Sequence, residues 1–440
     1  MSTFSIGLSM FAFMLVLMAV RVPIAISMFV PGAVGYVLLS GWLPLLAHLK
    51  GAVYGRVSVY DLSVIPLFML MGGLAVQGGL AKALFDFANS LLGRFRGGMA
   101  MAGVLACAAF GSISGSTVAT TATIAQVAYP QMRRIGYTGR MATAALATGG
   151  TMGVLLPPSV TLMVYAILTE QNITKMFLAA YVPALIAAVG YLLAIALVVR
   201  LQPDQAPAAS AASASEVLGA ALRVWPIVAI FVVVFGGIYG GLFTATEGAA
   251  IGNVLTLAIT LARREIDAGK FVAAVRTTAQ TSGMIFLIFI GADMINAALA
   301  LSQLPAQLAD LVGHLSIPPL LVMGGIMLFY VALGCVMDEM SMILLTVPTL
   351  FPVVMGMEFF GLGGADKALW FGILILTVCE IGMIFPPGGL NVYVMNGLAR
   401  DVPMAETYRG VVPFLVTDGI RLTLLILFPS LTLWLVHRLT

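Results

Sequence analysis

Long runs of apolar residues, interrupted at a few polar positions, dominate this chain. The runs cover residues 4–20, 22–41, 57–80, 99–130, 141–170, 176–199, 224–242, 244–262, 281–303, 317–355, 367–398 and 411–436. A helix needs about 20 residues to cross a bilayer, so most runs predict one crossing each. Two of the longer runs carry a polar, glycine-containing interruption, GSISGSTVATT from Gly111 and GCVMDEMS from Gly334. Each of these two is either a pair of crossings or a re-entrant hairpin, which enters and leaves on one side.

Two other runs are broken by a proline pair, Pro157-Pro158 and Pro386-Pro387. A proline pair removes two backbone donors and moves the preceding residue out of helical geometry. The carbonyls that lose their partners are tolerated at membrane depth only where they face protein or a watery cavity. Such breaks at corresponding positions of two halves indicate the binding site of a transporter.

Charged residues beside the two interrupted runs predict opposite entry sides. Arginines flank the first run, at Arg94 and Arg96 before it and Arg133, Arg134 and Arg140 after it, whereas the second is flanked by almost none. The positive-inside rule then predicts a hairpin entering from the cytoplasm and a second entering from outside. The same rule places Arg21, Arg200, Arg263, Arg264, Lys270, Arg400 and Arg409 inside and leaves Lys50, Arg56, Lys175, Lys367 and Arg438 outside. This assignment predicts ten crossings, two hairpins and external termini.

Ordered matches between the two halves indicate an internal repeat. The segment from Ile65 matches that from Met284, Gly111 matches Gly334, and the proline pairs match, at offsets of 219, 223 and 229 residues. We therefore predict an all-α polytopic membrane protein of two inverted repeats. The first covers 1–201 (hairpin about 97–132, broken helix about 141–170), a small-residue linker covers 202–216, and the second covers 217–440 (hairpin about 317–356, broken helix about 367–398).

Composition supports the membrane assignment. The chain is 61% hydrophobic and 9% charged, whereas soluble domains carry roughly 25% charged residues. A net charge of +3 is too small and scattered to indicate nucleic-acid binding. Cys107, Cys335 and Cys379 lie in apolar runs without metal-ligand spacing, so we expect packing roles. The run 4–20 has no basic region before it and is interpreted as a first crossing rather than a cleaved signal.

Hydroxyl side chains gather at the first interruption. Hydroxyls and freed carbonyls are hard oxygen donors that suit an alkali cation. Small polar residues also let helices approach closely, so packing is the competing interpretation. A second broken segment, containing Thr148, Thr151 and Gly153, strengthens the ion-site interpretation. The hydroxyl residues of the first interruption are Ser112, Ser114, Ser116, Thr117, Thr120 and Thr121.

Carboxylates mark the second interruption, where Asp338 and Glu339 are adjacent. An intramembrane carboxylate costs about 2.5–3.5 kcal/mol on insertion scales, so such residues normally face a cavity. A cation is a plausible partner for Asp338. Glu380, near the second break, is expected either to take part in transport or to pair with an arginine. Asn391 follows that break, where the amides at the start of a half-helix suit an anion.

Two other polar clusters favour structural roles. Thr244 and Glu247 have the spacing of a helix capping box, and Asp418 and Arg421 are spaced for an ion pair within the last helix. An intramembrane hydrolase is the main enzyme alternative, but a serine nucleophile needs a base within reach. His48, His314 and His437 are expected in loops or at an end, and no phosphate loop is present. We therefore expect neither an enzyme nor ATP hydrolysis.

Several segments together resemble the large membrane subunit of tripartite ATP-independent periplasmic (TRAP) transporters. They are VPIAISM, FGSISGSTVATTATI, GGTMGVLLPPS, TATEGAAIG, LGCVMDEMSMILLTVP, EIGMIFPPGGLNVYV and FPSLTLWL, and the resemblance runs through essentially the whole chain. Two features depart from it: Glu339 at the second interruption, and Gly388-Gly389 where a bulkier residue is expected.

The resemblance implies an elevator-type sodium symporter of the bacterial inner membrane with no cofactor beyond sodium. It implies a small four-helix membrane subunit, a periplasmic substrate-binding protein, and an organic-acid substrate such as a dicarboxylate or sugar acid. Carried over motif by motif, it places sodium at Ser112, Ser114, Gly115, Thr151, Gly153, Gly334, Met337, Asp338, Gly382 and Phe385, and substrate at Ser116, Thr117, Pro158, Gly388 and Asn391. The alternative is a stand-alone sodium-coupled anion symporter that needs no binding protein.

Overall fold

The computed structural model describes residues 3–20, 22–208, 212–304, 306–307 and 318–439, and within them every regular element is a helix. Arg21 and His314 lie outside the described residues. The first half contains α1 (Thr3–Ala19), α2 (Ile24–Ser40), α3 (Trp42–Val57), η1 (Tyr60–Ser63), α4 (Val64–Gln77), α5 (Leu80–Leu92), α6 (Gly98–Ser114), α7 (Thr117–Ile135), α8 (Gly139–Thr151), α9 (Val160–Leu168), α10 (Ile173–Leu201) and η2 (Pro203–Gln205).

The second half continues after the described part of the linker. It contains α11 (Ala214–Tyr239), α12 (Ala245–Ala262), α13 (Ala268–Ser302), α15 (Pro319–Gly334), α16 (Glu339–Met355), α17 (Gly364–Gly382), α18 (Leu390–Leu398), α19 (Met404–Leu427) and α20 (Ser430–Leu439). Six helical segments in the described residues are long and apolar enough to cross a membrane: 60–77, 173–201, 214–239, 245–262, 268–302 and 404–427. The chain is thus a multi-pass membrane protein, and ten crossings remain a prediction.

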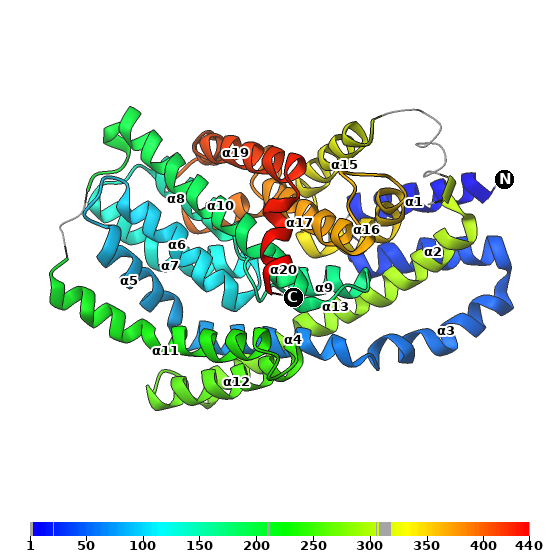
Figure 1. Cartoon of the computed structure of the whole chain (residues 1–440), viewed down its shortest axis with the longest axis horizontal. Coiled ribbons are helices and arrows are strands. Elements are labelled where there is room, and N and C mark those ends of the chain that lie inside the picture. Colours follow the sequence, from blue (N-terminus) through cyan, green and yellow to red (C-terminus); the bar gives the residue numbers. More distant parts are fainter. Residues whose placement is uncertain (1–2, 21, 209–211, 305, 308–317, 440) are drawn as a thin grey trace.

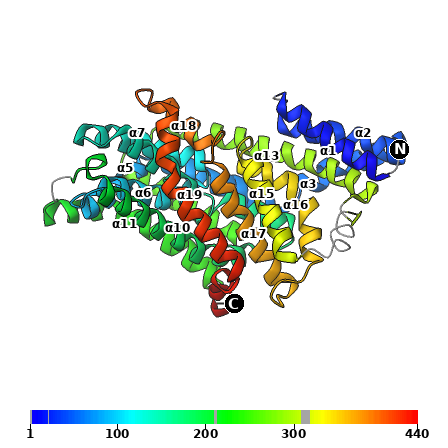
Figure 2. The ribbon, with the colours of Figure 1, turned by 90° about the horizontal axis from the view of Figure 1, so that it is seen from above.

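Both predicted hairpins are present as helix–turn–helix pairs, α6–α7 and α15–α16. Figure 1 shows the two pairs on either side of α17 and α20, while α3, α4, α11 and α12 run along one edge. Figure 2 shows the same separation of the hairpins from above. The first pair covers residues 98–135 and the second covers 319–355, and residue 317, the first of the second predicted hairpin, lies outside the described part. The side from which each hairpin enters stays a prediction.

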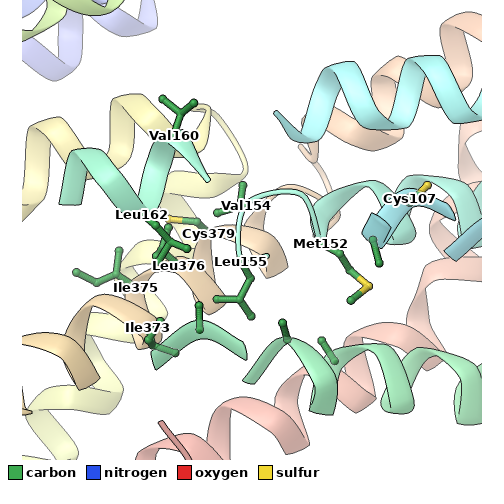
Figure 3. Packing of buried hydrophobic residues seen from close by; sticks show 14 of the residues in the cluster. Cys107, Met152, Val154, Leu155, Val160, Leu162, Ile373, Ile375, Leu376 and Cys379 are labelled. Carbon is green, nitrogen blue, oxygen red and sulfur yellow. The ribbon is translucent and has the colours of Figure 1, made fainter. Parts of the chain in front are cut away.

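Both predicted breaks are also present. The first separates α8 from α9 and the second separates α17 from α18, and each contains a cis peptide bond within its proline pair. Side chains of the first break are packed between the two halves of the chain. Figure 3 shows Leu155 on the side of the break that faces Leu376 and Cys379 of α17, with Met152 on the opposite side, the side of Cys107 of α6. All of these side chains are buried.

Four elements differ from the sequence expectation. The helices α3 and α5 were not predicted, and His48 lies in α3 rather than in a loop. The helix α13 begins at Ala268, well before the apolar run it contains, and the last run is divided into α19 and α20 just before Pro429. Proline cannot donate a backbone hydrogen bond and restricts the residue before it, which accounts for the division. In α5 only one face is buried, at Leu80, Leu84, Phe85 and Ala88. Polar residues on its other face interrupt the apolar pattern, so the sequence shows no continuous apolar run there.

Candidate functional site

The first hairpin turns at Gly115, which adopts a positive φ of 61° and ends α6. The next residue, Ser116, caps α7, because its hydroxyl accepts a hydrogen bond from the Ala119 backbone N–H. The Ser114 hydroxyl lies 2.7 Å from the Thr120 hydroxyl. Three hydroxyl-bearing residues therefore meet where α6 ends and α7 begins.

This tip is packed directly on the first break. A Cβ added to Gly111 would lie 2.5 Å from the Gly153 Cα, and one added to Gly115 would lie 3.4 Å from the Pro158 carbonyl oxygen. The backbones of the hairpin and the break come into contact because Gly111 and Gly115 carry no side chain. This close contact brings together the ends of α6 and α8 and the beginnings of α7 and α9.

The second hairpin is packed on the second break in the same way. A Cβ added to Gly334 would lie 2.7 Å from the Gly382 Cα, and one added to Gly388 would lie 1.6 Å from the Cys335 carbonyl oxygen. The second contact gives a reason for glycine at 388, where the resemblance leads us to expect a bulkier residue. Cys335 therefore lies at a backbone junction, while Cys107 and Cys379 are core residues as expected.

Each carboxylate of the second tip has a distinct partner. Asp338 caps α16: it accepts hydrogen bonds from the Ser341 backbone N–H at 3.2 Å and from the Ser341 hydroxyl. Glu339 points to the first hairpin, where the Thr117 hydroxyl donates to it at 3.2 Å. The two tips, 222 residues apart in sequence, are thus in direct polar contact.

A cavity of about 280 Å³ lies between these tips and a wall formed by α2, α4 and α13. Its polar lining comes from the tips and from α9 and α13, and its apolar lining comes from α13 and from single residues of α2, α4, α7, α9 and α16. A neighbouring cavity of about 1010 Å³ is bounded by the second tip, α13 and the start of α2. The polar residues of the smaller cavity are Ser114, Ser116, Thr161, Thr281, Asp338, Glu339 and Ser341.

The predicted sodium residues fall into two groups. Ser114, Gly115 and Asp338 line the smaller cavity, and Met337 lines the larger one together with Asp338. The others lie away from the described linings: Ser112 and Thr151 donate to carbonyls of their own helices, Gly153, Gly334 and Gly382 form the backbone contacts, and Phe385 is partly exposed at the second break.

The predicted substrate residues are less closely gathered. Ser116 lines the smaller cavity and Thr117 lies just behind it against Glu339. Asn391 is buried, and its amide donates to the Ala147 carbonyl at 3.2 Å, which joins α18 to α8. Pro158 and Gly388 form the packing contacts described above. The assignments of ion and substrate to individual residues remain predictions.

Two structural interpretations are confirmed. Thr244 and Glu247 form a capping box at the start of α12. Arg421 pairs with Asp418 at 3.0 Å and also with Glu380 at 2.7 Å, so the arginine partner expected for Glu380 is found. The Tyr191 hydroxyl donates to Asp418 at 2.9 Å. This buried cluster joins α10 of the first half to α17 and α19 of the second.

Some polar contacts could not be found from the sequence. Thr161 and Thr281 line the cavity but occur in apolar helices without a recognisable motif. Tyr129 near the end of the first hairpin donates at 2.5 Å to Asp401, which lies in a loop outside the membrane-spanning segments, and this hydrogen bond holds the pKa of Asp401 below its usual range. Arg133 is 3.2 Å from the same carboxylate, so α7 is held to the loop after α18.

Two helical hairpins, each packed on a broken helix beside a shared cavity, define a polytopic membrane carrier. Residues 11–431 match the family described as "Tripartite ATP-independent periplasmic transporter, DctM component". The chain belongs to this family, whose members are permease subunits rather than enzymes.

Named relatives agree with this assignment. The chain is 31% identical, over 85% of its length and 86% of the relative's, to the C4-dicarboxylate TRAP transporter large permease protein of Pseudomonas aeruginosa. It is 29% identical to the sialic acid TRAP transporter large permease protein of Vibrio cholerae, over 87% of each chain. Among solved structures, the YdaH transporter of Alcanivorax borkumensis shares the fold, with a TM-score of 0.57, 17% identity and 88% of each chain covered.

Proposed function

We propose that this chain is the sodium-coupled permease of a tripartite transporter in the bacterial inner membrane. It carries an organic-acid anion that a periplasmic binding protein delivers, and it works with a small four-helix membrane subunit. The two hairpins and the two breaks form the moving body, and α2, α4 and α13 form the wall along which that body moves between the two sides.

The charge of the cavity lining supports sodium coupling. Asp338 and Glu339 face the smaller cavity, and no lysine or arginine is among the described residues that line it. Two like charges about 5 Å apart repel by roughly 3 kcal/mol at an effective dielectric constant near 20. An acid anion therefore needs accompanying cations to occupy this space, and the hydroxyls and carboxylates there suit sodium.

The names of the relatives support the substrate class. They include permeases for C4-dicarboxylate, sialic acid and 2,3-diketo-L-gulonate, all of which are organic acids. For this chain we propose an organic acid of the dicarboxylate or sugar-acid class.

Transport in proteoliposomes tests the proposal. With this chain and its small subunit in the membrane and the binding protein outside, an inward sodium gradient should drive uptake of succinate, sialic acid or 2,3-diketo-L-gulonate. An equal potassium gradient and added ATP should not. Full uptake without the binding protein would favour the stand-alone symporter, and uptake indifferent to sodium would refute the coupling.

Two substitutions test the proposed ion sites. Asp338→Asn removes the charge but keeps a residue that caps helices equally well, and Ser114→Ala removes one hydroxyl at the first tip. We expect each to raise the sodium concentration for half-maximal uptake about tenfold without loss of folded protein. The matched control is Ser90→Ala, because the Ser90 hydroxyl donates only to a carbonyl of α5. Unchanged sodium dependence in both variants would remove the tips from the ion sites.

A further inference from the structure

The carboxylate of Glu339 lies where the N-terminal ends of two half-helices meet. Glu339 is the first residue of α16, and its partner Thr117 is the first residue of α7. The Thr117 hydroxyl lies 3.2 Å and 3.4 Å from the two carboxylate oxygens. Only 8% of the residue is exposed.

The surroundings of this carboxylate are those that a bound anion needs. The first amides of a helix lack partners within the helix and carry positive partial charge, so they favour a carboxylate. In this chain two such helix ends face the same cavity from opposite hairpins. A carboxylate that belongs to the chain already lies between these two helix ends, where the Thr117 hydroxyl donates to it.

We propose that Glu339 is an internal mimic of the substrate, whose carboxylate holds the anion position between the two tips until the acid group of the substrate replaces it. The proposal rests on the proposed function, and it identifies the part of the substrate that is recognised. The recognised group is a single anionic head, which a carboxylate and a sulfonate share. The remainder of the substrate lies in the cavity toward α13.

Charge distinguishes this role from a purely structural contact. A structural contact needs only an acceptor for Thr117, and a glutamine side chain supplies one in nearly the same volume. A mimic competes through its negative charge, because it repels an arriving anion and occupies the donors that the anion needs. Removing the charge should therefore strengthen binding of the acid, whereas loss of an ordinary binding residue would weaken it.

Direct binding to the purified complex tests the proposal. The chain and its small subunit, in nanodiscs and in sodium buffer, are titrated by calorimetry with succinate, sialic acid and isethionate in separate experiments. For the acid that binds the unaltered complex best, Glu339→Gln should lower the dissociation constant about tenfold, and Glu339→Ala should change it in the same direction. Glu358→Gln is the matched control, because Glu358 follows the same hairpin, is exposed and lies away from both cavities.

Equal or weaker binding by both Glu339 variants would overturn the proposal. Loss of folded, monodisperse complex in both would assign the carboxylate to folding and would also overturn it. The proposed function is judged separately, by sodium-driven uptake of the unaltered complex. A complex that transports normally but binds no better without the Glu339 charge would refute only the mimic.

Discussion

Replacing Arg421 with alanine is expected to destabilise the protein by about 3–5 kcal/mol, the usual result of removing one partner from a buried ion pair. Arg421 is 2% exposed and is the basic partner of both Glu380 and Asp418. Without it, two carboxylates stay buried, and among the described contacts only the hydrogen bond from the Tyr191 hydroxyl to Asp418 remains. Desolvation of an unpaired carboxylate costs far more than a lost surface contact. The amount of folded protein in the membrane should fall sharply.

Fluorescence-detected size exclusion and thermal melting of the detergent-solubilised protein measure this effect. Arg409→Ala is the matched control on the same helix, because Arg409 forms an exposed ion pair with Glu406, and exposed pairs contribute at most about 1 kcal/mol. Neutralising the partners as well, with Glu380→Gln and Asp418→Asn, should restore part of the stability. Wild-type melting of the single variant would show that the cluster does not stabilise the fold.

The second large effect is expected for Gly334→Ala. The new methyl group would lie 2.7 Å from the Gly382 Cα, so the second hairpin and the second break must separate or bend. Overpacking of this kind typically costs 1–3 kcal/mol. Because this junction also positions the second tip, we expect a lower melting temperature together with reduced sodium-driven uptake.

Gly324→Ala is the control for that substitution. Gly324 lies in the same helix, α15, and a Cβ there meets nothing within 4 Å. Alanine has a helix propensity about 1 kcal/mol better than glycine, so this variant should be neutral or slightly stabilised. Equal damage from both substitutions would mean that α15 tolerates no added methyl group, and that the contact between Gly334 and Gly382 has no special role.

The hairpins and breaks were predictable because local chemistry marks them. Proline pairs interrupt a helix regardless of its neighbours, and glycine beside hydroxyl residues in an apolar run indicates a turn. The same local reasoning found the capping box at Thr244 and the pairing of Asp418 with Arg421. These features depend on spacings of three or four residues within one helix.

Contacts between the halves were not predictable in this way. The sequence does not distinguish the roles of Asp338 and Glu339. Only the fold shows that Asp338 caps its own helix and that Glu339 accepts a hydrogen bond from Thr117. Nothing near Glu380 in sequence identified Arg421 as its partner. The helices α3 and α5 were missed because they carry polar residues that interrupt the apolar pattern, so tertiary packing rather than hydropathy determines where they lie.

The pairing of the halves has a consequence for how the protein is made. The Tyr165 hydroxyl donates to the Ala368 carbonyl and the Tyr191 hydroxyl to Asp418, across 203 and 227 residues of sequence. At 5–20 residues per second, synthesis takes roughly 10–45 s to deliver those partners after the first half has entered the bilayer. For that time the first half must hold buried hydroxyls that have not yet met their acceptors.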